Sequence, residues 1–334
     1  MRNYINAVVE VVRKHSTIAR LTIVVLCFGI LLWNIHPREI IAAYAQAHGW
    51  YLFYAVLLMI PNVGLQAVKW NYIMNALNPK PSFRTVCVSL FGGFFLGASS
   101  PGRTGELARG VFVPGHSVVR VASLTVVDKG FNIIIIVLTG LLSLAFLLPG
   151  YLSLVPLVLE VVVLMAIFNI HRLEQHIGKI LHRFTHSERV DNALAAFDTL
   201  SRKNVTIMLV ISVIFYSVYA SQFFLMLLCF TDISFEIAAK TIPVTYLIQV
   251  LLPISIGDFG IKEMVMVQLL GPFGIPAGAS FSATFLNNVL TFLVPSLLGG
   301  VLMIFVRPSL GRAVPPSDSR TNSPSPRSSR QAAS

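Results

Sequence analysis

The sequence alternates long apolar runs with short polar or basic segments. A membrane-spanning helix needs about 20 predominantly apolar residues to cross a hydrocarbon core of roughly 30 Å. Runs that reach or approach this length predict spans at 21–35, 49–76, 121–148, 152–170, 205–230 and 279–306. We therefore expect an all-α integral membrane protein with six full transmembrane helices.

Two further apolar segments are interrupted by polar residues. In the first segment, 85–113, the break falls at 99–105, and in the second, 241–271, it falls at 253–260. Backbone groups left unpaired in lipid cost several kcal/mol each, so a polar loop at membrane depth has to be buried in protein or line a cavity. Charged groups at that depth are rare unless they act on a ligand. The two breaks therefore form the candidate functional site.

The distribution of basic residues predicts how the interrupted segments are threaded. Cytoplasmic segments carry an excess of Lys and Arg, and here these residues gather in 1–20, in the loop 171–204 and in the C-terminal tail. Lys69, Lys80 and Arg84 place the end of the second span on the same side. If either interrupted segment crossed the membrane once, the basic regions would not all share one side. We therefore expect two re-entrant helical hairpins that enter from opposite faces, with both termini in the cytoplasm.

The order of the elements predicts an internal repeat. Each hairpin is flanked by full spans, so 49–148 and 205–306 are expected to form an inverted repeat of the kind found in transporters, whose broken helices meet near the middle of the bilayer. We expect one membrane domain over 1–310 and a disordered tail, rich in Ser, Pro and Arg, over 311–334. Within the loop 171–204, an interfacial amphipathic helix and a solvated pair of helices are both open.

Composition supports a membrane protein and argues against a soluble protein, nucleic-acid binding and a metal site built from cysteines. Of 334 residues, 55% are hydrophobic and 12% are charged, which differs strongly from a soluble domain. The formal net charge of +11 does not indicate nucleic-acid binding, because the basic residues lie between spans and no recognition motif accompanies them. The three cysteines lie in apolar runs without metal-ligand spacing. We expect a multi-pass protein of the cell (inner) membrane.

Both breaks combine glycines with charge. The residues expected to shape the loops are Pro101, Gly102, Gly105, Pro253, Gly257 and Gly260. The residues expected to bind substrate are Arg103, Glu106, Arg109, Asp128, Lys129, Asp258, Lys262 and Glu263. Ser100 and Asp258 are expected to cap the helices that follow. The basic side chains and the free N–H groups of these helices favour an anionic ligand, most naturally the phosphate of a lipid head group.

A structural role for the same charges stays open. Glu106 and Arg109 are three residues apart, and Asp258 and Lys262 are four apart. Such spacings place opposite charges on one face of a helix, where they neutralise each other. The charges would then act as a clasp between the hairpins.

Other candidate sites carry weaker signals. Asp128 and Lys129, at the head of a span, are equally consistent with a pair at the membrane interface. His182 and His186 are four residues apart, but a flexible loop is a poor cage for a metal ion. The sequence contains no nucleotide-binding loop, zinc-binding helix or nucleophile elbow. We therefore expect neither a metal nor a cofactor.

The two motifs resemble the transmembrane, flippase-like part of the lysylphosphatidylglycerol synthase family. The residues that carry the resemblance are Pro101, Gly102, Arg103, Gly105, Glu106 and Arg109 in the first motif, and Pro253, Ser255, Gly257, Gly260 and Glu263 in the second. The resemblance implies a role in moving, or helping to move, a lipid-linked head group across the membrane. At Asp128, Lys129, Asp258 and Lys262 the chain differs from the residues usual in the family. The soluble aminoacyl-transferase domain of the synthases has no counterpart in the short tail, so lipid lysylation is not expected.

Three functions are consistent with these observations. The first, which we favour, is a translocase that is not an enzyme. It would move an anionic or sugar-bearing head group of a membrane lipid or lipid-linked glycan, either downhill or coupled to protons on Glu106, Glu263 or Asp258. The second is a membrane-embedded enzyme of lipid or polyisoprenoid-glycolipid synthesis, with Glu106 or Asp258 as general base. The third is an accessory subunit that docks a biosynthetic synthase through the loop 171–204.

Overall fold

The computed structural model describes residues 37–98, 100, 103–169, 202–252 and 259–305. Within these ranges every regular element is a helix, which confirms the all-α prediction for this part of the chain. The elements are α2 (Pro37–Ala45), α3 (Gly49–Met74), α4 (Phe83–Ala98), η1 (Thr104–Phe112), α5 (Val118–Leu147), η2 (Gly150–Ser153), α6 (Leu154–Phe168), α9 (Arg202–Phe230), α10 (Phe235–Leu251), α11 (Ile261–Leu270), η3 (Gly271–Phe273), α12 (Ala277–Asn288), η4 (Val289–Leu293) and α13 (Val294–Phe305).

Five helical runs in the described ranges are long and apolar enough to cross a membrane. They are Gly49–Met74, Val118–Leu147, Gly150–Ile167, Lys203–Phe230 and Ala277–Phe305. These runs match five of the six predicted spans to within a few residues. The predicted first span, most of the loop with His182 and His186, and the predicted tail lie outside the described residues. The total of six spans and the positions of the termini therefore stay predictions.

The two interrupted segments form pairs of short helices. α4 is followed by the 3-10 helix η1, and α10 is followed by α11, and the two helices of each pair pack against each other. Residues 83–112 are referred to below as the first helical pair, and residues 235–270 as the second helical pair. α4 has 16 residues and α10 has 17, both fewer than the about 20 needed to cross a bilayer. The helices end and restart around the predicted breaks.

Glycines allow the first helical pair to close. A Cβ atom added at Gly93 would lie 2.5 Å from the side chain of Arg109, and one added at Gly97 would lie 2.7 Å from that of Glu106. This order of contacts shows that η1 runs antiparallel to α4. A Cβ atom at Gly105 would collide with the backbone of α4 itself. The close approach therefore depends on the missing side chains, and it fixes where the charged residues of η1 lie.

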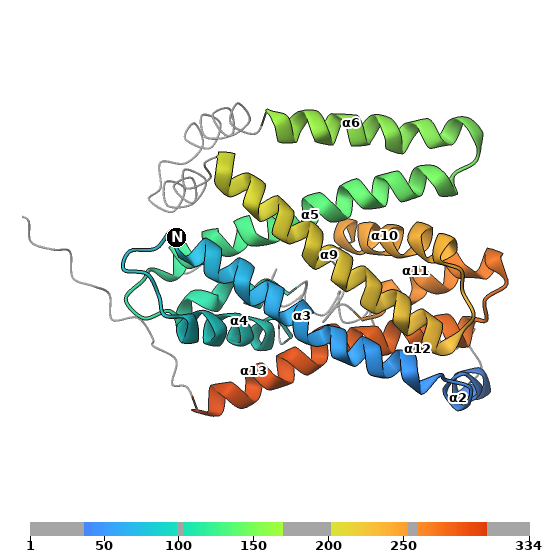
Figure 1. Cartoon of the computed structure of the whole chain (residues 1–334), viewed down its shortest axis with the longest axis horizontal. Coiled ribbons are helices and arrows are strands. Elements are labelled where there is room, and N and C mark those ends of the chain that lie inside the picture. Colours follow the sequence, from blue (N-terminus) through green and yellow to red (C-terminus); the bar gives the residue numbers. More distant parts are fainter. Residues whose placement is uncertain (1–36, 99, 101–102, 170–201, 253–258, 306–334) are drawn as a thin grey trace, which may run out of the picture.

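The long helices differ in how deeply they are buried. α3 and α9 pack along each other across the molecule (Figure 1). α5 contacts η1, α6, α9 and α10, so it connects the two halves of the chain. α6 lies at the edge, where α5 is its main partner (Figure 1), and most of its apolar side chains are exposed. A helix that is apolar all round and exposed is suited to a lipid environment.

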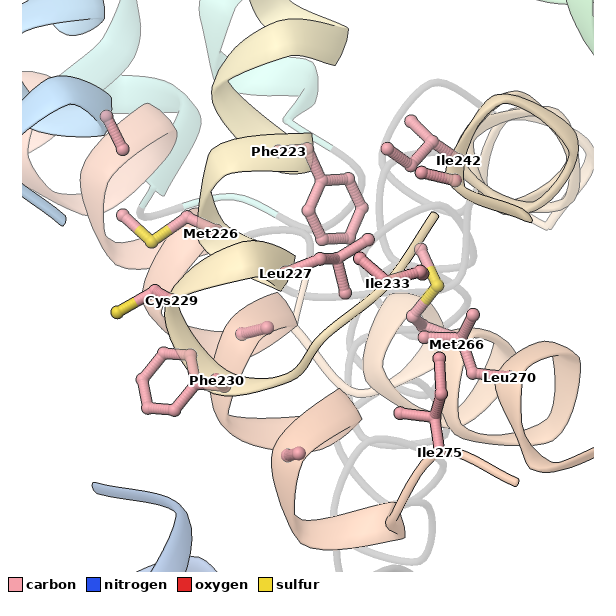
Figure 2. Close-up of a cluster of buried hydrophobic side chains, with 14 of the residues drawn as sticks. Phe223, Met226, Leu227, Cys229, Phe230, Ile233, Ile242, Met266, Leu270 and Ile275 are labelled. Atoms are coloured by element: carbon pink, nitrogen blue, oxygen red, sulfur yellow. The ribbon is translucent and has the colours of Figure 1, made fainter. Parts of the chain in front are cut away.

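Two clusters of buried apolar side chains hold these helices together. One cluster joins α9, α10, α11 and α12 and includes Phe223, Ile242 and Met266 (Figure 2). The other joins α3, α4 and α5 and includes Trp70 and Phe94. Lipid tails are as apolar as these side chains, so helix contacts in a membrane are stabilised by close packing. The two clusters therefore support one helical pair each.

The last long run is irregular at one place. α12 ends at Asn288, and the π-helical segment η4 separates it from α13. π-helical turns occur frequently at functional sites. Here the segment directly follows Asn287 and Asn288, two amides that are completely buried. The irregularity thus marks a polar position inside an otherwise apolar run.

Candidate functional site

Ser100 links the end of α4 to the start of η1 by hydrogen bonds. The backbone N–H of Gly105 donates a hydrogen bond to Oγ of Ser100 over 2.6 Å, and this hydroxyl donates to the carbonyl of Gly97. Ser100 thus satisfies a free N–H group in the first turn of η1. The N-cap position itself is occupied by Arg103, which makes no side-chain cap, so Ser100 acts from a position earlier in the chain than the N-cap. Arg103 has φ 57° and ψ 26°, a left-handed conformation that is uncommon for a residue with a side chain. Such strained residues cluster at ligand sites.

Glu106 lies at the centre of an ion-pair network. Its carboxylate contacts Nε of Arg103 at 2.5 Å, a terminal nitrogen of Arg109 at 2.6 Å and Nζ of Lys129, on α5, at 2.9 Å. A 3-10 helix has three residues per turn, so side chains three apart lie directly above one another. Arg103, Glu106 and Arg109 therefore share one side of the loop and η1. The pairing of Glu106 with Arg109 is confirmed.

Asp128 extends the network to a third helix. Its carboxylate lies 3.1 Å from Nζ of Lys69, on α3, and 3.4 Å from Arg109. Lys69 also donates hydrogen bonds to the backbone carbonyl of Asp128 and to Oδ1 of Asn132. Asp128 and Lys129 therefore belong to the interior network and not to a pair at the membrane interface.

Lys69 does not mark the orientation of its helix. The sequence predicts that this residue lies at the cytoplasmic end of its span, but it is 1% exposed and ion-paired inside the molecule. A lysine whose charge is balanced by a buried carboxylate says nothing about membrane orientation. Lys80 and Arg84 lie after the end of α3, so the orientation argument for this segment now depends on them.

The described part of the network contains four cations and two carboxylates, which are Lys69, Arg103, Arg109, Lys129, Glu106 and Asp128. Charges in a low-dielectric interior need partners, so these side chains hold one another in place. The side chains of Arg103 and Lys129 are 24% and 34% exposed, whereas those of Lys69 and Arg109 are each 2% exposed. Arg103 and Lys129 are therefore the cations that a ligand can reach.

A cavity of about 280 Å³ lies beside the network, referred to below as the charged cavity. One wall consists of Arg103, Glu106, Arg109, Asp128 and Lys129, and the facing residues on α9 and α10 include Tyr219, Tyr246 and Gln249. Lys129 lies eleven residues after the first residue of α5, which is about 16 Å along the helix axis. This is close to half of a hydrocarbon core of roughly 30 Å. The charged cavity is therefore near the middle of a membrane-length helix and is lined by both helical pairs.

The charged residues of the second helical pair lie behind this cavity. Nζ of Lys262 donates to Oδ1 of Asn288, whose Nδ2 donates to Glu263 over 2.7 Å. Glu263 also accepts a hydrogen bond from the backbone N–H of Gly260. Lys262 lies 5.1 Å from the centre of the Tyr246 ring, a favourable cation–π arrangement. These contacts join α11 to α12, so Lys262 and Glu263 act at least as a clasp within the second half.

The structure thus places the predicted site residues in three groups. Those around the charged cavity are Arg103, Glu106, Arg109, Asp128 and Lys129. Lys262 and Glu263 are completely buried and do not line the cavity, but Lys262 lies beside the ring of Tyr246, which does. Those outside the described residues are Asp258, Pro101, Gly102, Pro253 and Gly257. Substrate binding by any of them stays a prediction.

The two described loop glycines have different roles. Gly105 is needed for the close approach of η1 to α4. Gly260 precedes α11 with φ 96°, a conformation that glycine adopts without steric cost. Both positions therefore favour glycine, and a role of either residue in shaping a ligand site stays a prediction.

The sequence analysis missed uncharged polar residues in the long helices. Asn62 and Gln66 on α3 line the charged cavity, and Asn62 donates a hydrogen bond to Gln222 on α9 over 3.1 Å. Asn62, Gln66 and Lys69 are spaced four and three residues apart, which puts them on one helix face. This regular spacing of polar residues within an apolar run is the sequence pattern that could have identified Asn62 and Gln66. Tyr219 and Tyr246 carried no such signal, because tyrosine is common in apolar runs.

The site is suited to binding an anion. Among the described residues, no group of three or more His, Cys, Asp and Glu side chains is placed to hold a metal ion. Both carboxylates of the network are contacted by at least two cations. Charge-assisted hydrogen bonds from Arg and Lys to phosphate are among the stronger polar contacts in proteins. Arg103 and Lys129 are positioned to make them.

Fold and site together define a multi-pass helical membrane protein with a charged cavity inside it. A family model described as the lysylphosphatidylglycerol synthase TM region matches residues 17–299. The chain therefore belongs to this family, which confirms the resemblance carried by the two motifs. A UPF0104 membrane protein of Methanocaldococcus jannaschii is 22% identical over 286 residues, covering 77% of this chain and 85% of that protein. One of Pyrococcus horikoshii is 23% identical over 311 residues, covering 82% and 92%.

Proposed function

We propose that this protein is a lipid translocase in which the charged cavity receives an anionic or sugar-bearing lipid head group. The supporting observation is a cavity of about 280 Å³ near mid-depth of α5, lined by both helical pairs and by two partly exposed cations, Arg103 and Lys129. Charged side chains at such depth usually mark a pathway or a ligand site. The substrate is a membrane lipid or a lipid-linked glycan.

We further propose six full spans and two re-entrant hairpins in an inverted repeat, in the cell membrane with both termini cytoplasmic. The order of described elements supports this threading. α3, the first helical pair and α5 are followed later by α9, the second helical pair and the run from α12 to α13. α3 and α9, which open the two repeats, pack together. Broken helices that meet at mid-depth are the usual binding sites of inverted-repeat transporters.

The buried cations and the accessible cations of the network have different roles in this proposal. Arg109 and Lys69 are held by Glu106 and Asp128, so this part of the cavity keeps its shape when a ligand leaves. Arg103 and Lys129 share Glu106 as a partner. An arriving phosphate competes with Glu106 for both of them. Binding and release then involve an exchange of partners by these two side chains.

Movement between leaflets is driven downhill or by protons in this proposal. The sequence contains no nucleotide-binding loop. A ligand shifts a conformational equilibrium only by its difference in affinity between the two states. The charged cavity provides such a difference if the two helical pairs separate on one side at a time, because its walls come from both.

A leaflet-accessibility assay tests the proposal. The purified chain is reconstituted into liposomes that contain a fluorescent phosphatidylglycerol, and a membrane-impermeant reductant is added outside. Translocation makes the inner-leaflet fluorophore accessible. We expect Arg103→Ala and Lys129→Ala to slow this phase about tenfold or more, because each removes a charge-assisted hydrogen bond of roughly 1.5–3 kcal/mol.

A matched control removes a cation elsewhere. Lys240 pairs with Glu236 on the exposed side of α10 and is not part of the charged cavity. Lys240→Ala should translocate at the wild-type rate. The proposal fails if Arg103→Ala and Lys129→Ala also keep that rate, or if wild-type protein leaves the inner leaflet protected.

A further inference from the structure

A second cavity, referred to below as the apolar groove, has a volume of about 370 Å³. It is lined by side chains within 139–143 on α5, 216–224 on α9 and 235–243 on α10, most of them small or apolar. Leu142 and Phe235, at its edge, are 43% and 72% exposed. Since α5 is long and apolar enough to cross a membrane, we expect a groove with exposed apolar side chains along it to face lipid.

The apolar groove and the charged cavity follow one another along the same two helices. On α5, the charged cavity uses residues 128–136 and the groove uses residues 139–143. On α10, the charged cavity uses residues 246–250 and the groove uses residues 235–243. α9 contacts both helices and contributes residues to both spaces. A polar space at one end and an apolar space at the other match the two ends of a lipid.

Tyrosine rings form the boundary between the two spaces. Tyr219 and Tyr246 line the charged cavity and Tyr216 lines the apolar groove. The Tyr246 ring lies 4.8 Å from that of Tyr219 and 6.3 Å from that of Tyr216. The buried hydroxyls of Tyr216 and Tyr246 have no partner at ordinary hydrogen-bond geometry, although Thr139 lies near the first and Tyr219 and Asn287 lie near the second. A buried hydroxyl is more stable when it is well paired, so the boundary suits a ligand that carries an acceptor oxygen.

We infer that the apolar groove holds one hydrocarbon chain of the lipid whose head group enters the charged cavity. The oxygen atoms at the junction of head group and chain then accept hydrogen bonds from Tyr216 and Tyr246. This inference rests on the proposed function and adds a binding site for the hydrocarbon chain. From Phe235 to Pro243 the groove follows eight residues of α10, about 12 Å. This is most of one leaflet of a hydrocarbon core of roughly 30 Å.

The small residues of α9 support this occupant. Ser217, Ala220 and Ser221 line the apolar groove. In membrane proteins, small residues normally let two helices touch along their length. Here they border open space, because α9 meets α10 through the tyrosine rings instead. The space that remains is apolar and open to the bilayer, where hydrocarbon chains are the abundant apolar groups.

Photocrosslinking tests the inference. The full chain is reconstituted with phosphatidylglycerol that carries a diazirine on one acyl chain, and cross-linked peptides are mapped by mass spectrometry. We expect cross-links to concentrate within 139–143, 216–224 and 235–243. Ser221→Trp, which fills the groove, should lose them. Val158→Trp on α6, at a position 61% exposed outside both cavities, should keep them.

Two results would overturn the inference. One is cross-linking spread evenly over the exposed apolar helices, α6 included, and the other is groove cross-linking that persists in Ser221→Trp. The translocation assay on the same liposomes separates this failure from that of the proposed function. Groove cross-linking without translocation rejects the translocase and supports the binding of a hydrocarbon chain in the apolar groove. Translocation without groove cross-linking rejects only the binding of the chain in the groove.

Discussion

At the scale of single residues, Arg109 is expected to contribute most to stability within the charged network. It contacts both Glu106 and Asp128, it is buried, and its guanidinium lies 5.0 Å from the Trp70 ring. Glu106 and Asp128 keep their other cations when Arg109 is removed, but two buried charge-assisted contacts are lost, and each such contact contributes roughly 1.5–3 kcal/mol. Arg109→Ala should therefore lower the unfolding midpoint of the detergent-solubilised protein strongly, as measured by intrinsic fluorescence during chemical denaturation.

The matched variant is Arg103→Ala. Arg103 contacts the same carboxylate, Glu106, but its side chain is 24% exposed, and pairs that water can reach contribute about 1 kcal/mol or less. Arg103→Ala should therefore lose translocation with little loss of stability, and Arg109→Ala should lose both. Equal stability losses in the two variants would show that burial does not separate their roles.

The charged residues of the first break could be predicted from the sequence, but their partners could not. Arg103, Glu106 and Arg109 are recognisable because charge beside a backbone break is unusual in an apolar run. Lys69 was misassigned, because a lysine near the end of a span has the same sequence pattern whether it faces water or a buried carboxylate. Only the packing of α3 against α5 decides between the two.

At the scale of elements, the closure of α4 onto η1 is expected to depend on Gly105. A Cβ atom there would collide with the backbone carbonyl of Leu96, and a backbone cannot yield as a side chain can. Gly105→Ala should therefore push the helices apart and destabilise the protein by about 1–3 kcal/mol, the usual cost of overpacking. The measurement is the unfolding midpoint, together with loss of translocation because Glu106 moves with η1.

The control for Gly105 is another helical glycine with free space around it. A Cβ atom at Gly64, on α3, would meet nothing within 4 Å. Gly64→Ala should be neutral or stabilising by up to about 1 kcal/mol, since alanine is the better helix former. A stable and active Gly105→Ala variant would show that the close approach is not required.

The long helices followed from hydropathy, whereas their irregular parts did not. The predicted spans agree with the described runs because length and apolar composition are local properties of the sequence. The 3-10 geometry of η1 depends on its fit against α4, and the π-helical turn at η4 follows Asn288, which bonds to Lys262 and Glu263 far along the chain. Such features arise from tertiary contacts, so no local sequence pattern predicts them.

At the scale of the whole molecule, the two proposed repeats meet where α3 packs along α9. The amide of Asn62 donates to Gln222, and Gln222 donates to the backbone carbonyl of Ala55. Both side chains are buried. The basic segments along the sequence predicted two repeats but did not indicate which helices join them. The hydrogen bonds of these polar residues link α3 to α9 at one defined position along the two helices.

A double-mutant cycle tests whether this amide pair is a specific link between the halves. Gln222→Leu leaves the Asn62 side-chain N–H group buried without its partner, which should cost about 1–3 kcal/mol. Replacing both Asn62 and Gln222 by Leu removes donor and acceptor together, so the double variant should be closer to the wild type in stability than the single variants suggest. Chemical denaturation in micelles measures all four proteins. Additive losses would show that the two side chains act independently, and the link between α3 and α9 would then have to come from apolar packing alone.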